Sequence, residues 1–138
     1  MPEYKIIIND PKTGKSFQKV ITGTEADYLK GRKIKETIHG DNFGIKGYEL
    51  LLTGGSDKSG VPMRFDIEGQ ARKRPLLTKG PGVHITVRGM KTRKTMAGNT
   101  VAEGTAQINL KITKYGTKNL NEIFGVKEEA KEEKLKEA

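Results

Sequence analysis

The stretch AQINLKITK, residues 106–114, decides the fold class because its large apolar side chains recur at every second position. Ile108, Leu110 and Ile112 alternate with polar residues, which is the period of a β-strand that buries one face. Gly supplies 17 of the 138 residues, a share above the usual ~7 % that favours tight turns between short elements. The sequence therefore predicts a mainly β protein, built as a small Gly-rich β-barrel.

Other segments on either side of this strand have the composition of short strands. They are residues 4–8, 16–22, 34–38, 48–53, 65–67 and 84–88. The first two flank the turn sequence NDPKTG, residues 9–14, so we expect them to form a hairpin. A long loop over residues 54–60 is expected after the fourth.

One or two short helices are expected beside the strands. In TEADYLKG, residues 24–31, Thr24 is the predicted N-cap, and Gly31 is the predicted end. A second helical turn is predicted over residues 119–124, with Asn119 as its cap.

The last segment differs from the rest of the chain. Residues 126–138 hold four Lys and five Glu with almost no apolar side chains, which is typical of a charged helix or a disordered tail. We therefore expect a β-barrel domain over residues 1–125 and a Glu/Lys-rich helical or disordered tail over residues 126–138.

The charge balance points to a polyanionic partner. Lys and Arg number 26 against 17 Asp and Glu, and the formal net charge is +9. An excess of this size on a small domain favours binding to nucleic acid. The chain has no Cys, which excludes disulfides and thiolate metal sites. No apolar run approaches the ~20 residues of a membrane span, and no signal-peptide pattern occurs at the start, so we expect a cytoplasmic protein.

No catalytic, metal or cofactor site is visible in the pattern of residues. Gly14, Lys15 and Ser16 resemble the end of a phosphate-binding loop, but Asn9 stands where that motif requires Gly. The two histidines, His39 and His84, are far apart in sequence. We therefore expect neither an enzyme nor a small-molecule ligand; the rival hypothesis, an enzyme acting on an anionic substrate, has no convergent set of polar residues.

The basic residues are segregated in one interval. No Asp or Glu occurs between Glu68 and Glu103, whereas eight cations do. Uncompensated cations repel one another, and an external anion relieves that repulsion. The predicted nucleic-acid contacts of this interval are Arg72, Lys73, Arg74, Lys79, Arg88, Lys91, Arg93 and Lys94.

The interval contains no aromatic residue, so we expect recognition of the sugar–phosphate backbone rather than base stacking. A free-standing β-barrel that binds single-stranded nucleic acid is the alternative. It would need a row of stacking rings, and the four tyrosines are scattered along the chain: Tyr4, Tyr28, Tyr48 and Tyr115.

The most specific motif is LTGGSDKSGVPM, residues 52–63. Two adjacent Gly after a strand permit a bulge or a positive φ, and an Asp in the loop can bond backbone N–H groups. The Pro then fixes the exit direction, the Met is expected to pack beneath, and Lys58 is the predicted nucleic-acid contact of the loop. The residues of this signature loop are Gly54, Gly55, Asp57, Gly60, Pro62 and Met63.

This motif resembles the signature of the eukaryotic-type small-subunit ribosomal protein number six family, and all its fixed positions are met. Residues 76–80, 93–95 and 108–110 are also similar to that family. Where the family pattern has Arg-Pro, this chain has His84 and Ile85. The resemblance covers nearly the whole body of the chain.

The resemblance implies a β-barrel-like protein of the small ribosomal subunit that binds ribosomal RNA (rRNA), without catalytic activity. It implies neighbouring ribosomal proteins as further partners and a ribosome-associated location in the cytoplasm. The long basic C-terminal helix of the eukaryotic form, with its phosphorylated serines, is missing, and no Ser follows Ser59. The chain therefore resembles the short archaeal form.

Overall fold

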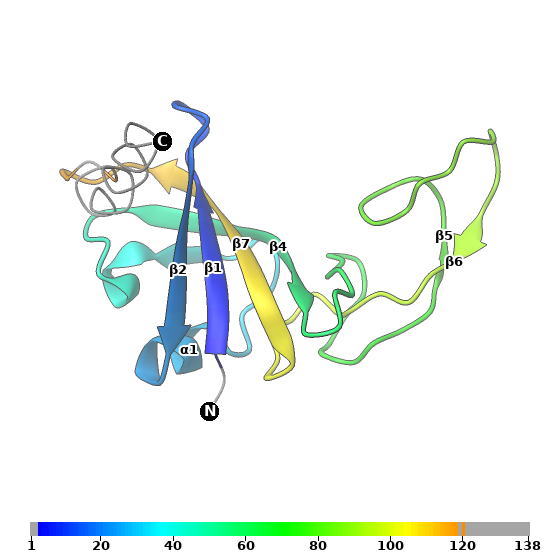
Figure 1. The fold of residues 1–138 in the computed structure, drawn as a ribbon, viewed down its shortest axis with the longest axis horizontal. Coiled ribbons are helices and arrows are strands. Elements are labelled where there is room, and N and C mark those ends of the chain that lie inside the picture. The colour runs from blue at the N-terminus through cyan, green and yellow to red at the C-terminus, as the bar shows by residue number, and fades with distance from the viewer. Residues whose placement is uncertain (1–2, 119, 121–138) are drawn as a thin grey trace, which may run out of the picture.

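The structure is a computed structural model that describes residues 3–118 and 120. Figure 1 shows a curled sheet with a long excursion of the chain beyond one end of it. The elements are β1 (Glu3–Asn9), β2 (Ser16–Thr22), α1 (Thr24–Leu29), β3 (Thr37–His39), the 3-10 helix η1 (Gly40–Phe43), β4 (Glu49–Asp57), β5 (Leu76–Leu77), β6 (Thr92–Arg93) and β7 (Thr105–Lys114).

Five strands form the main sheet in the order β2-β1-β7-β4-β3. β1 and β7 run parallel, and the other neighbouring pairs are antiparallel, including the predicted hairpin of β1 and β2. The sheet curls into a half-barrel. The mainly β class and the strand over residues 106–114, now the central β7, are confirmed.

The period-2 pattern of the strands explains the core. Ile6 and Ile8 of β1 pair with Ile108 and Leu110 of β7, and all four are fully buried. Leu52 of β4 continues the row on the other side of β7. Ala26 and Leu29 of α1 bury their side chains in the same cluster. Each large aliphatic side chain withdrawn from water in this way contributes about 1.5–3 kcal/mol to folding.

β4 does not end where the sequence predicts. It continues through Gly54 and Gly55 to Asp57, with register shifts against β7 that mark β-bulges. Neither glycine has a positive φ. Bulges bend and twist a strand, so β4 bends at the two glycines and stays paired with β7 as far as Asp57 instead of opening a loop at residue 54.

Several other predicted bounds need correction. Thr24 begins α1 but does not cap it: Gly23 is the N-cap, with φ +64° and no side-chain hydrogen bond. The strand predicted over residues 34–38 begins only at Thr37, since the N–H groups before it bond Asn99 and Leu52.

The strands predicted over residues 65–67 and 84–88 are turns and irregular chain, whereas β5 and β6 were not predicted. The helical turn predicted over residues 119–124, Leu120 apart, and the tail over 126–138 lie outside the described residues.

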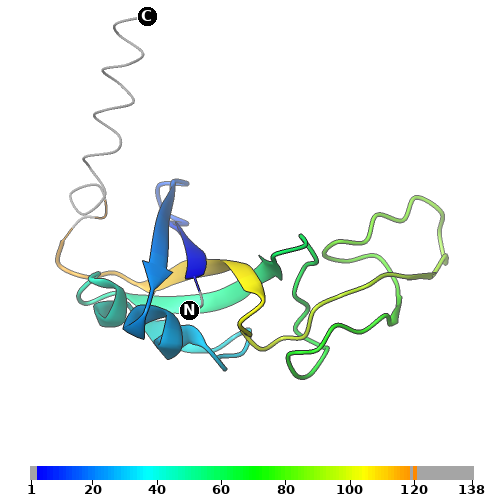
Figure 2. The same cartoon turned by 60° about the horizontal axis from the view of Figure 1, so that its bottom comes forward.

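Residues 64–100, which we call the lobe, form the excursion beyond the sheet (Figure 2). The lobe has its own small apolar cluster, and β5 pairs with β6 across it. The buried members of that cluster are Ile67, Leu77, Val83 and Met96. A cluster this small leaves most side chains of the lobe exposed.

Candidate nucleic-acid interface

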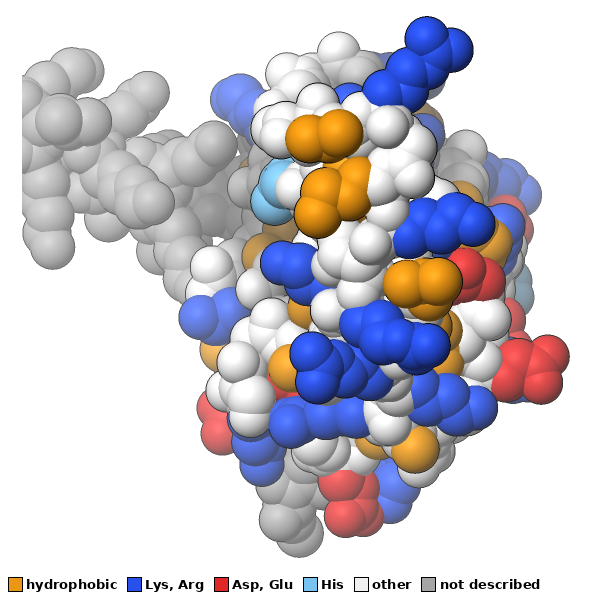
Figure 3. Space-filling view, turned by 90° about the vertical axis from the view of Figure 1, so that its right-hand side faces the viewer, with side chains coloured by type: hydrophobic (Ala, Val, Ile, Leu, Met, Phe, Trp, Pro, Cys, Tyr) orange, Lys and Arg blue, Asp and Glu red, His pale blue; other side chains and the backbone are white. Residues whose placement is uncertain are grey.

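The lobe carries all eight basic residues of the acid-free interval, and every one of them is exposed. Figure 3, which looks onto the lobe from beyond the sheet, shows basic side chains spread over this face with apolar ones among them. Lys73 and Arg74 lie just before β5, while Arg93 in β6 and Lys94 lie on the partner segment. Residues twenty positions apart in sequence are thereby brought together.

Within the described part of the chain, only one of the eight cations has an ion pair. The Arg72 guanidinium lies 2.7 Å from Oδ2 of Asp57 and also donates to the Ser59 hydroxyl at 3.0 Å. Arg93 donates to the carbonyl of Arg74 at 3.4 Å, a long bond that neutralises no charge. Arg72 therefore already has a structural role, and the other cations are available to an external anion.

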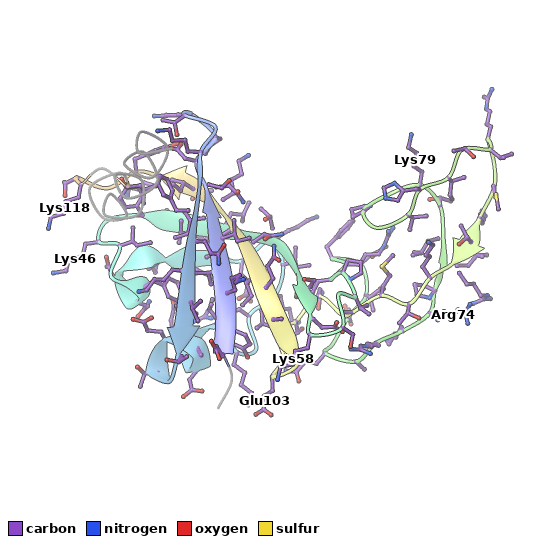
Figure 4. The ribbon with its side chains drawn as sticks, in the orientation of Figure 1. Lys46, Lys58, Arg74, Lys79, Glu103 and Lys118 are labelled. Atoms are coloured by element: carbon purple, nitrogen blue, oxygen red, sulfur yellow. The ribbon has the colours of Figure 1, made fainter. Side chains whose placement is uncertain are left out.

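Lys58 lies at the junction of lobe and sheet, immediately after β4. Its backbone N–H donates to the carbonyl of Gly104 at 3.0 Å, and its side chain is exposed. Figure 4 places Lys58 at the base of the lobe, with Arg74 and Lys79 farther out. The structure thus places Lys58 on the same side of the molecule as the other predicted contacts.

Asp57 organises the signature loop through its side chain. Its Oδ1 accepts the N–H of Ser59 at 2.9 Å and that of Val61 at 3.0 Å, while Oδ2 accepts the guanidinium of Arg72. This is the capping role that an Asp followed by a tight turn predicts. Asp57 therefore joins the loop to the first basic residue of the lobe.

The signature loop also ties the two ends of the lobe to β4. The N–H of Met63 donates to the carbonyl of Gly55 at 2.9 Å, and the N–H of Ala97 donates to the carbonyl of Pro62 at 2.9 Å. Met63 is buried in the main core, as expected, with its sulfur near Gly55. The motif is thus the anchor that holds the lobe against the sheet.

The environment of Asp57 favours its charged form. Burial raises the pKa of the carboxyl, but the N–H groups of Val61 and Ser59 and the Arg72 guanidinium outweigh burial, and the pKa lies below its ordinary value. A carboxylate with a lowered folded-state pKa stabilises the fold above its ordinary pKa of about 4. That contribution is lost as the pH falls through the folded-state pKa.

An Asp57→Asn variant should therefore be less stable at neutral pH but not in acid. We expect a loss of about 1–2 kcal/mol in the free energy of unfolding at pH 7, because charge-assisted hydrogen bonds are lost. Urea unfolding of both proteins from pH 7 down to pH 2 measures the difference, which should shrink below pH 4.

The Arg72→Gln variant is the control, because it removes the partner of Oδ2 and keeps both backbone bonds to Oδ1. It should retain part of the pH dependence. A difference between Asp57→Asn and the original protein that stays constant at every pH would contradict this account.

The fold adds basic and aromatic residues that the sequence analysis missed. The segment over residues 31–36 lies beside residues 99–101, so exposed Lys33 and Lys35 join the base of the lobe. Lys35 has an unusual φ of +76°, and its ammonium lies 4.2 Å from the ring centroid of Phe65, which is 51 % exposed. The basic residues within 30–35 were visible in the sequence, but their position beside residues 99–101 was not.

The sheet does not offer a row of stacking rings. Tyr4 and Tyr48 are buried in the main core, and Tyr28 and Tyr115 pack against it half-buried. Their burial removes the stacking surface that a single-strand binder uses. This observation counts against the alternative hypothesis.

Among the described residues, no group of His, Asp and Glu has the arrangement of a metal site. No helix in that part of the chain is long and apolar enough to span a bilayer. His39 and His84 are both exposed, one in β3 and the other in the lobe.

Comparison with known proteins agrees with the resemblance that the signature carries. The model of the ribosomal protein S6e family matches residues 4–125. The chain is 42 % identical to the small ribosomal subunit protein eS6 of Methanocella arvoryzae over 128 residues, which cover 93 % of this chain and 90 % of that protein. The eS6 protein of Methanocaldococcus jannaschii is 43 % identical over 128 residues, 91 % of this chain and 94 % of that protein.

The eS6 protein of Archaeoglobus fulgidus is 41 % identical over 128 residues and is covered over 99 % of its length. The family is one of ribosomal proteins and not of enzymes. Both the family match and the identity span most of this chain, and they include the signature loop over residues 52–63. The chain therefore belongs to the ribosomal protein S6e family.

Proposed function

We propose that this protein is a structural constituent of the small ribosomal subunit that binds rRNA through the lobe and Lys58 and so supports translation. Its partners are small-subunit rRNA and neighbouring ribosomal proteins, and it acts on ribosomes in the cytoplasm. The RNA-binding domain spans residues 1–125, followed by the charged tail. No cofactor or small-molecule substrate takes part.

The observation that carries this proposal is the set of unneutralised cations on the lobe. Seven of its eight interval cations have no ion pair among the described residues, and all are exposed. Phosphates of RNA can supply the missing counter-charges. Arg binds phosphate with a planar fork and Lys with a point charge, so the lobe combines both modes.

The shape of the molecule supports the same proposal. The lobe extends beyond the sheet, so it can enter a fold of RNA while the half-barrel stays outside (Figure 1). Asp57, Met63 and Ala97 hold its base in place. The sheet serves as the rigid support, and contacts to the sugar–phosphate backbone position it on the RNA.

Sedimentation of a tagged copy in cell extract tests the proposal. We expect the protein to travel with small subunits at low salt and to leave them at high salt, because phosphate contacts weaken as salt rises. The control is the same gradient after nuclease digestion, which should release the protein. If the protein stays at the top of the gradient at every salt concentration, the proposal is wrong.

A further inference from the structure

The outer end of the lobe is a tight turn with two apolar side chains. The N–H of Met90 donates to the carbonyl of Val87 at 3.3 Å, and Gly89 between them has φ +79°. This left-handed conformation suits glycine at the third position of a turn. Val87 and Met90 therefore flank the reversal of the chain, and we call residues 87–90 the tip.

Both side chains of the tip are unusually exposed. Val87 is 61 % exposed and Met90 52 %. Of the large apolar side chains that are exposed in the described part of the chain, Val20 alone lies in the sheet, and the others lie in the lobe. Val87 and Met90 are exposed together on one turn, and a pair of this kind marks a contact surface, whereas a single exposed side chain needs no explanation.

The charges around the tip select the partner. The tip borders an open hollow of about 410 Å³ whose rim carries Lys79, Arg88 and Lys91. None of these cations has an ion pair among the described residues, and no acidic residue occurs in the interval. A surface that is apolar at its centre and only basic at its rim fits a polyanion with an accessible apolar face.

An RNA base that has left its helix offers such a face. In a regular RNA helix the bases are stacked and the major groove is too deep and narrow for side chains, whereas bases in bulges and loops are splayed out. Aliphatic side chains act as wedges between base steps in other nucleic-acid complexes. Phe65 lies against Lys35 at the base of the lobe, and residues 69–102 lack aromatic rings. At the tip, therefore, Val87 and Met90 are the exposed apolar side chains that can contact a base.

We propose that Val87 and Met90 insert into an irregular site of the rRNA, a bulge or an internal loop, while Lys79, Arg88 and Lys91 bind the phosphates beside it. This inference rests on the proposed function and adds the kind of RNA site that the lobe recognises. The apolar contact provides affinity that salt does not screen, and the cations provide the salt-dependent part.

The apolar and the salt-dependent contributions to affinity can be separated by equilibrium binding. The full chain is bound to deproteinised small-subunit rRNA over a range of salt concentrations. A Val87→Ser/Met90→Gln variant should bind on the order of 10- to 100-fold more weakly, with the same salt slope as the original protein. The control Val20→Ser removes a comparable side chain that is 49 % exposed on β2. It should change neither the affinity nor the salt slope. Circular dichroism checks that each variant is folded.

A perfectly paired RNA duplex is the second probe. The tip variant and the original protein should bind it with equal affinity, because it has no splayed base. An equal loss on both RNAs, or a tip variant that binds rRNA as tightly as the original protein, would overturn the inference and leave the rRNA-binding proposal standing. If the original protein shows no salt-dependent binding to rRNA, both proposals are wrong.

Discussion

Removing four positive charges from the lobe should release the protein from small ribosomal subunits while leaving its fold unchanged. The substitutions are Arg74→Gln, Lys79→Gln, Arg93→Gln and Lys94→Gln. If each side chain contacts one phosphate, we expect affinity to fall by several hundred-fold at ~0.15 M salt. Arg72 is left unchanged because a substitution there would break its ion pair with Asp57 and so alter stability as well as binding. Co-sedimentation with small subunits measures the loss.

The matched control removes the same number of charges from the body: Lys5→Gln, Lys46→Gln, Lys111→Gln and Lys118→Gln. All four side chains are exposed. Lys46 and Lys118 lie at the end of the molecule opposite the lobe (Figure 4). This variant has the same net charge as the lobe variant and should remain with the subunits. Equal loss by both variants would mean that binding follows net charge and not the lobe.

The second large effect concerns the stability of the signature loop. A Cβ added at Gly55 would lie 2.3 Å from the carbonyl oxygen of Gln107 on the neighbouring β7 and 3.2 Å from the sulfur of Met63. The backbone of two paired strands would have to separate. We expect Gly55→Ala to cost about 3 kcal/mol of unfolding free energy, which corresponds to a fall in melting temperature of about 10 °C.

The adjacent glycine provides the control. A Cβ at Gly54 would have no heavy atom within 4 Å, and its φ is not positive. Gly54→Ala should therefore change the melting temperature by only a few degrees, in either direction. Thermal unfolding of the two variants measures both effects. Equal destabilisation by both variants would contradict this account. It would mean that both glycines are required for their backbone conformation, and not that Gly55 is required for the close approach of β4 to β7.

The sequence predicts the strands of the half-barrel well because burial of one face leaves a period of two. β2 has the predicted bounds, β1 is one residue longer than predicted at each end, and β7 begins one residue earlier than predicted. The order of the strands is not local information. Nothing in residues 4–8 or 106–114 alone indicates that β1 and β7 pair in parallel at the centre of the sheet.

In the lobe, local sequence patterns do not predict the observed strands. The stretch over residues 84–88 has the composition of a strand, yet only Val83 beside it is buried, and the chain turns at residues 87–90. β5 and β6 have two residues each, too few to show any period. Their pairing depends on the contacts of Leu77 and Met96 within the small cluster of the lobe.

The candidate site was predicted in part, because charge segregation is visible without a fold. The missing acids over residues 69–102 identify the lobe cations directly. The pairing of Arg72 with Asp57 depends on how the loop turns. Lys33 and Lys35 belong to the candidate site only because hydrogen bonds join residues 31–36 to residues 99–101, more than sixty positions away. Tertiary contacts of this kind leave no periodic trace in the sequence.

The salt dependence of binding to purified small-subunit rRNA tests the central claim most directly. The slope of log affinity against log salt should fall in magnitude by about 3 in the lobe variant, since each phosphate contact contributes roughly 0.7–0.9. The slope of the body variant should equal that of the original protein. An unchanged slope in the lobe variant, with binding still salt-dependent, would contradict the claim that the lobe binds the phosphates of rRNA.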